Sequence, residues 1–157
     1  MRTLMALWIV AASLALVAAC SSDDDGSSGA SPAIGCAADS RKDIYAAGLA
    51  KPAGQLEVML VESRPGPPIR GTNALTIEIR DAAGSPLDGA TVTVTPWMPD
   101  HAHGSAARPV VTSLGGGRYR IDRVYLAMAG LWQIKVGVQP ATGGALEEAK
   151  FHFCLEG

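Results

Sequence analysis

The chain has 157 residues, of which 13 are basic and 15 acidic, so its formal net charge at pH 7 is −2. This balance offers no basic surface of the kind that binds nucleic acid, and we expect no nucleic-acid partner. The length suits one folded domain with an additional tail rather than two domains.

The first 19 residues are typical of a bacterial export signal. Arg2 precedes the apolar run Leu4–Ala19, which at about 16 residues is shorter than the roughly 20 of a spanning helix. The run ends in Leu16-Val17-Ala18-Ala19-Cys20, which resembles the lipobox of bacterial lipoproteins. We therefore predict that residues 1–19 are removed as a signal peptide and that Cys20 is lipidated. A plain signal peptide with an incidental cysteine and a membrane-spanning anchor are the alternatives.

The residues after Cys20 indicate where the protein would be held. The acidic stretch Asp23–Asp25 disfavours a spanning anchor, since such anchors carry Lys or Arg on their cytoplasmic side. In lipoproteins generally, Asp after the cysteine favours the inner membrane, whereas this chain has Ser21. For a Gram-negative cell we predict a lipid anchor in the outer membrane, facing the periplasm. Residues 20–35 are mostly Ser, Asp, Gly and Ala, and are predicted to form a flexible linker.

Two cysteines, Cys36 and Cys154, remain once Cys20 is assigned to the lipid. In an oxidising compartment an even pair favours a disulfide, which would tie the end of the linker to the last strand. A pair of metal-binding thiols is the alternative. Between the linker and the strands, residues 39–49 could form a short helix, capped by Asp39 or Ser40 and ended by Gly48 or Pro52.

From residue 55 onward, apolar and polar residues alternate with the period of β-strands. The loop Pro65–Pro68 interrupts this pattern, and the apolar phase switches near Asp122-Arg123, which predicts a bulge or a bend. About seven short strands predict an all-β, immunoglobulin-like antiparallel β-sandwich over residues 36–157, with its core in 55–154. A small barrel is the alternative. The predicted strands are 55–62, 75–79, 91–95, 108–114 (a short edge strand), 119–128, 132–138 and 149–154.

One loop concentrates the candidate chemistry of the chain: Met98-Pro99-Asp100-His101-Ala102-His103-Gly104. In extended backbone His101 and His103 point to the same side, and Met98 adds a thioether nearby. Imidazole together with thioether favours copper. Met128 could complete the site from a neighbouring loop, because strand ends meet at one end of a sandwich. Four zinc ligands are not evident, although Asp100 could contribute one.

Each of these residues also has an interpretation without metal. A His-x-His loop is usually solvated. Met98 could plug the end of the core beside Trp97. Met128 shares the phase of Val124 and Leu126 and could belong to the core.

The loop resembles the "MPxHxHG" signature of the YtkA-like/FixH family of small periplasmic β-domains. Later segments resemble the family's "GxY" and "M-x-G-x-W" blocks, and Asn73 and the turn 84–90 fit as well; the resemblance covers residues 55–138. It implies an immunoglobulin-like sandwich and an association with copper handling and cytochrome oxidase assembly. The implied site residues are Met98, His101, His103 and Met128. FixH proteins have a membrane-spanning N-terminus, from which this chain departs. The two later blocks are Gly117-Arg118-Tyr119 and Met128-Ala129-Gly130-Leu131-Trp132.

We expect no enzymatic activity, because the sequence lacks a nucleophile elbow, a P-loop and a dinucleotide fingerprint. Glu147 and Glu148 are adjacent, so a strand would place them on opposite faces. Two functions are compatible with the sequence. One is a copper-binding lipoprotein of the cell envelope, anchored to the membrane by its lipid. The other is a metal-free structural or interaction module that holds another envelope protein.

Overall fold

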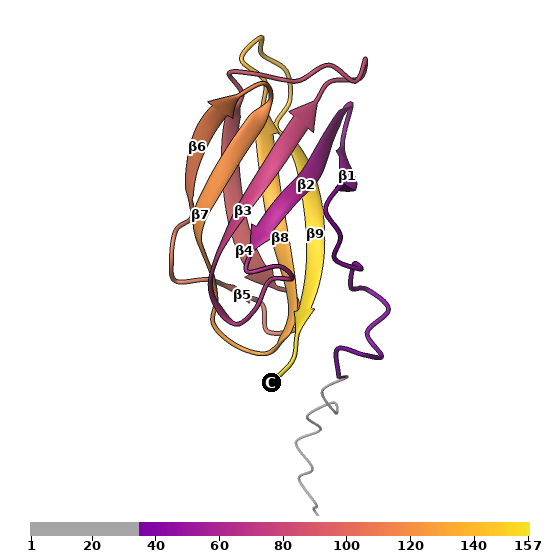
Figure 1. Ribbon diagram of the computed structural model, residues 1–157, viewed down its shortest axis with the longest axis vertical. Helices are drawn as coiled ribbons and strands as arrows, with labels where there is room; N and C mark the ends of the chain where they lie inside the picture. The colour runs from indigo at the N-terminus through magenta and orange to yellow at the C-terminus, as the bar shows by residue number, and fades with distance from the viewer. Residues whose placement is uncertain (1–34) are drawn as a thin grey trace, which may run out of the picture. The chain divides into compact units, whose positions relative to one another are not determined.

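The computed structural model describes residues 35–157, which form two antiparallel β-sheets packed face to face (Figure 1). The predicted signal peptide, Cys20 and all but the last residue of the predicted linker lie outside the described residues. The first sheet has the order β1-β2-β3-β7-β6, with strands Leu49–Ala53, Leu56–Arg64, Gly71–Arg80, Arg118–Leu126 and Val110–Gly115. The second has the order β5-β4-β8-β9, with strands His103–Gly104, Thr91–Met98, Gly130–Gln139 and Glu147–Leu155.

The core between the sheets follows from the period-two pattern of the sequence. In β3, Leu75, Ile77 and Ile79 are at most 2 % exposed, and β8 contributes Trp132 and Ile134 from the facing sheet. Each fully buried large apolar side chain contributes about 1.5–3 kcal/mol relative to an exposed one. The predicted all-β sandwich is therefore confirmed, as is the edge position of the strand at 110–115.

Nine strands are present in residues 35–157 where seven were predicted, and the predicted helix at 39–49 is wrong. In its place the chain turns and docks on β9. The Asp43 amide donates to the His152 carbonyl (2.8 Å), and the His152 amide donates to the Asp43 carboxylate (2.8 Å). These bonds fix Asp43 against β9, the edge strand of the second sheet, and β1 begins six residues later. Its Pro52 is tolerated because β1 is an edge strand.

The predicted bulge lies at Arg123, whose φ is +61°. Across β3 and β7 the pairing passes from Asn73↔Val124 to Leu75↔Ile121, so β7 carries an extra residue. The Asn73 side chain is buried and stabilises this irregularity. It accepts from the Ile69 amide (2.9 Å) and donates to the carbonyls of Ile69 (2.8 Å) and Val124 (3.4 Å). The shift in apolar phase thus reflects one local change in backbone geometry.

The connection from β3 to β4, which crosses between the sheets, is held by two side chains. The Tyr119 hydroxyl donates to the Leu87 carbonyl (3.0 Å) and accepts from the Ala90 amide (3.1 Å). The Asp88 carboxylate accepts from the amides of Gly116 (3.2 Å) and Gly117 (2.8 Å). Tyr119 and Gly117 belong to the block that resembles "GxY", which therefore has a structural role here.

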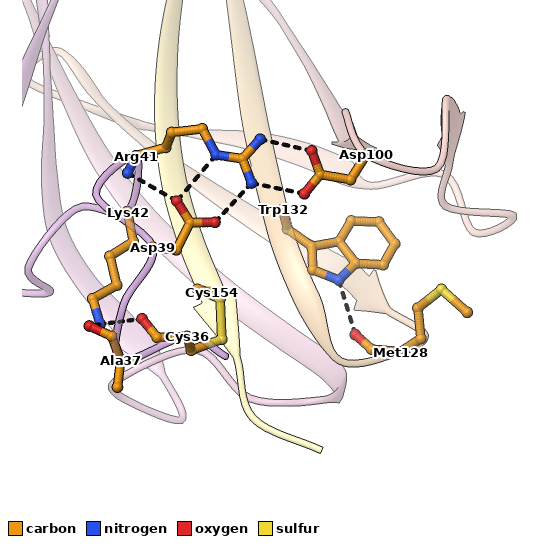
Figure 2. Close-up of a disulfide and its surroundings, with 9 residues drawn as sticks. All are labelled: Cys36, Ala37, Asp39, Arg41, Lys42, Asp100, Met128, Trp132 and Cys154. Carbon is orange, nitrogen blue, oxygen red and sulfur yellow. Dashed lines mark hydrogen bonds and ion pairs between the residues drawn. A yellow bond between two sulfur atoms is a disulfide. The ribbon is translucent and has the colours of Figure 1, made fainter. Parts of the chain in front are cut away.

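Cys36 and Cys154 form a disulfide, as predicted, with an Sγ–Sγ distance of 2.01 Å (Figure 2). The alternative of two metal-binding thiols is therefore wrong. The bond joins the turn that precedes β1 to the end of β9 across 118 residues of sequence. Over the described part of the chain, no helix is long and apolar enough to cross a membrane.

We expect the variant Cys36→Ala/Cys154→Ala to melt at least several degrees below the wild type. A cross-link that closes a loop of this length adds about 4–5 kcal/mol to the free energy of unfolding in the chain-entropy model. Losing that much lowers the melting temperature of a domain of this size by several degrees or more. Thermal unfolding followed by circular dichroism under oxidising conditions measures it. Equal melting temperatures, or two free thiols in the intact mass of the oxidised wild type, would contradict the assignment.

Candidate functional site

The candidate site is built on the hairpin between β4 and β5, at the lower end of the sandwich in Figure 1. Met98 and His103 are paired across the two strands and enclose a four-residue turn, residues 99–102. Ala102 closes the turn with φ +53°, which side chains rarely adopt. The sequence argument assumed extended backbone between His101 and His103. The left-handed Ala102 shows that this assumption is wrong.

The two histidines nevertheless lie close together, with ring centroids 5.8 Å apart. Two imidazoles that bind the same ion at about 2 Å have centroids no more than roughly 6 Å apart. The separation of the two rings is therefore within the range that one shared ion allows. Both residues are exposed. His103 Nδ1 lies 3.2 Å from the Gly104 carbonyl oxygen. A hydrogen on Nδ1 would donate this bond and leave the Nε2 lone pair for a metal.

Met98 lies beneath His103. Residues paired directly across two strands have their side chains on the same face, so Met98 and His103 are neighbours. Met98 is fully buried and part of the core, as its interpretation without metal predicted. A Cβ on Gly130 would lie 3.0 Å from the Met98 Cε atom, so the glycine leaves room for the end of this side chain. Its thioether is therefore packed in the core and is not open to solvent.

Trp132 forms the floor of the candidate site, a role that the sequence analysis did not assign. Its side chain is fully buried, and the His103 ring meets the indole edge-on, with centroids 6.3 Å apart and planes at 78°. The indole Nε1–H donates to the Met128 carbonyl (3.0 Å), as Figure 2 shows. In the "M-x-G-x-W" block, the tryptophan therefore holds the loop that contains the methionine of the same block, Met128.

Met128 itself is 40 % exposed and follows the end of β7 at Leu126. The alternative that it belongs to the core is therefore wrong. Its backbone is fixed by Trp132, while its side chain is accessible at the same end of the sandwich as the histidines. The structure thus brings Met98, His101 and His103 together on one hairpin and places Met128 on the adjoining loop.

Asp100 is engaged by an arginine and is not a free ligand. Arg41 Nη1 and Nη2 donate to its two carboxylate oxygens at 2.6 and 2.7 Å. The same guanidinium donates to Asp39 through Nε (3.0 Å) and Nη2 (2.7 Å). The hydrogen bond from Arg41 lowers the pKa of Asp100, and it lowers that of Asp39 to about 2. The suggestion that Asp100 contributes to a zinc site is therefore disfavoured.

The donor set that remains is two imidazoles with one or two thioethers. Among residues 35–157, no three His, Cys, Asp or Glu side chains gather in a way that could hold a metal. Zinc sites need about four such ligands. Thioether and imidazole instead suit copper, and thioether in particular suits Cu(I). The residues present therefore fit copper better than zinc.

Residues 50–137 match the model of the family described as YtkA-like. This chain belongs to the YtkA-like family. The match covers the His hairpin, Trp132 and Met128, but not Cys36, Arg41 or Cys154. The relation to FixH proteins stays a prediction. No curated protein and no solved structure matches the chain.

The pKa of Asp39 predicts how acid affects the ion pairs around Arg41. Because the folded pKa of about 2 lies below the ordinary value of 3.8, the unfolded chain binds more protons between these pH values. The stability contributed by Asp39 is therefore complete above about pH 5 and is lost progressively as the pH falls through the folded pKa. We expect Asp39→Asn to melt below the wild type at pH 5 and the difference to shrink towards pH 2.

The matched control is Asp122→Asn, which removes the partner of Arg120 in an exposed ion pair on β7. Such surface pairs contribute little, so this variant should differ from the wild type far less at pH 5. A melting difference for Asp39→Asn that persists unchanged down to pH 2 would contradict the assignment.

Proposed function

We propose that this protein is a copper-binding lipoprotein of the bacterial cell envelope. His101 and His103 would hold the metal above Met98, with Met128 available from the adjoining loop. The role would be metal handling or oxidase assembly, which the resemblance to the YtkA-like/FixH family implies, and not catalysis. The observation that carries the proposal is the 5.8 Å separation of the two imidazoles. They lie next to a methionine, and the carboxylate of Asp100, which precedes His101, is already bound to Arg41.

Membership of the YtkA-like family supports an envelope-associated domain, and the disulfide supports an oxidising compartment. The ligand chemistry supports copper as the metal. Imidazole serves either oxidation state of copper, whereas the soft thioether selects Cu(I). The exposed histidines and the accessible Met128 would allow a metal to reach the site directly from solvent.

We expect the domain 36–157 to bind Cu(I) with micromolar or tighter affinity, measured by titration against a competing chelator. Since the imidazoles supply most of the accessible donors, His101→Ala/His103→Ala should weaken binding at least tenfold. A matched control is His152→Gln, because His152 lies on β9, where its ring contacts Gln133. Binding weaker than micromolar in the wild type, or an affinity unchanged in the double variant, would exclude the proposal.

The lipid anchor is tested separately on the full-length chain in cells. We expect the wild type to incorporate labelled palmitate and to partition into detergent, and Cys20→Ser to do neither, because only the thiol of Cys20 would accept the lipid. Cys36→Ser is the control and should be labelled as the wild type is. Cys36 is held in a disulfide, so its thiol cannot accept the lipid. Equal labelling of wild type and Cys20→Ser would refute the lipoprotein prediction.

A metal-free interaction module remains the second candidate, and edge strand β6 favours it. Its residues are uncharged and mostly exposed, with Val110 46 % and Leu114 55 % exposed. Uncharged, accessible sheet edges can add a strand from another chain. An envelope protein that cross-links equally to wild type and to His101→Ala/His103→Ala, but not to Thr112→Lys on β6, would support this function over copper binding.

A further inference from the structure

The guanidinium of Arg41 connects two parts of the chain that are far apart in sequence. It binds both carboxylate oxygens of Asp100, 59 residues later, and both oxygens of Asp39 (Figure 2). Such bidentate pairs fix orientation as well as distance, because the planar fork of arginine matches a carboxylate. Asp100 directly precedes His101 in the turn between β4 and β5. Arg41 therefore holds the apex of the turn, and the strand pairing holds its base.

Arg41 is itself anchored to the body of the sandwich. The Asp39 side chain is 5 % exposed and also accepts from the Arg41 amide (2.9 Å). The Asp39 amide donates to the carbonyl of Cys36 (3.4 Å), which the Lys42 ammonium also contacts. Cys36 is joined to β9 by the disulfide. We call residues 36–43, from Cys36 to the Asp43 contact with β9, the tethered segment.

The turn that carries the histidines has few other restraints. His101 and His103 are exposed, and Ala102 adopts a left-handed conformation that residues with a Cβ rarely adopt. In the described part of the chain, the side-chain hydrogen bonds of Asp100 go to Arg41 alone. An arginine that spans such a turn has more influence on its order than on the stability of the whole domain.

We propose that Arg41 is a positioning residue of the copper site and that the tethered segment orders the His turn before metal binds. This inference rests on the proposed function and adds to it. Residues 36–43 precede the part of the chain that matches the family. Partners that orient ligands without touching the metal commonly change affinity tenfold to a hundredfold, and order that exists before binding does not have to be created by it.

The Cu(I) affinities of single and double variants test the positioning. We expect Arg41→Ala to weaken Cu(I) binding about tenfold and Arg41→Lys to restore part of it, since lysine keeps the charge without the fork. Asp100→Asn/Arg41→Ala should be no weaker than Arg41→Ala alone, because both changes remove the same contact. Arg120→Ala, which breaks an exposed pair on β7, is the matched control and should bind as the wild type does. An unchanged Cu(I) affinity in Arg41→Ala, with the wild type binding, would overturn the inference and leave the proposed function standing.

A second measurement does not need the metal. Backbone order parameters of residues 99–103 in the metal-free protein should be those of a rigid turn in the wild type and should fall below about 0.6 in Arg41→Ala. The rest of the sandwich should keep its values, which separates positioning from general destabilisation. Equal order of the turn in both proteins would overturn the inference whether or not copper binds. Failure of the wild type to bind Cu(I), with the turn loosened in Arg41→Ala, would instead remove the proposed function and keep the ordering role.

The tether has its own arm of the test. Cys36→Ala/Cys154→Ala, studied at a temperature where circular dichroism shows it folded, should show the same loosening of residues 99–103 as Arg41→Ala. A wild-type order of the turn in this variant would overturn the part of the inference that assigns ordering to the disulfide.

Discussion

The burial of Trp132 is the constraint on which the functional end of this sandwich depends. The indole is fully buried, and β8 pairs it with Phe153 on β9. Its one polar group donates to the Met128 carbonyl, so the loop after β7 is held by the same side chain that fills the core. The His103 ring packs against it from the hairpin side. Replacing a buried tryptophan with alanine typically destabilises a domain by 3–5 kcal/mol, and here the loss would also release the Met128 loop.

The residue that precedes Trp132 in β8 extends this organisation to the disulfide. Leu131 pairs with Cys154, so the cross-link is attached one position from the floor of the candidate site. From Cys36 the chain reaches Arg41 within five residues and contacts the His turn. At this end of the sandwich the core, the disulfide and the candidate ligands are therefore joined by direct contacts.

Much of the fold could be predicted because its signals are local. Alternation of apolar residues identified seven strands, and the switch in phase at Asp122-Arg123 identified the bulge. The two missed strands carry weak local signals: β1 contains Pro52, and β5 has only two residues. The false helix at 39–49 arose because Asp39 has the properties of a helix cap, whereas its carboxylate binds Arg41. Local propensity gave way there to contacts with β9 and the His turn.

The candidate site could be predicted only in part, for the same reason. The His-x-His spacing and the nearby methionine are visible in the sequence. The roles of Arg41 and Trp132 are not, because Arg41 acts on a residue 59 positions away and Trp132 looks like any other core residue of its strand. The left-handed Ala102 also had no signal, since glycine or asparagine is the usual residue there. The assumption of extended backbone was wrong even though the histidines do lie together.

The engagement of Asp100 changes the chemistry that the loop offers. A free carboxylate beside two imidazoles would favour zinc and other harder cations, since oxygen ligands suit them. The guanidinium of Arg41 pairs with the Asp100 carboxylate and lowers its pKa. The donors that remain are imidazole nitrogen and thioether sulfur. The same ion pair that orders the turn thus also restricts the ligand set. Arg41 lies only five residues after Cys36, so the tethered segment at the start of the domain limits the donors that the His turn presents.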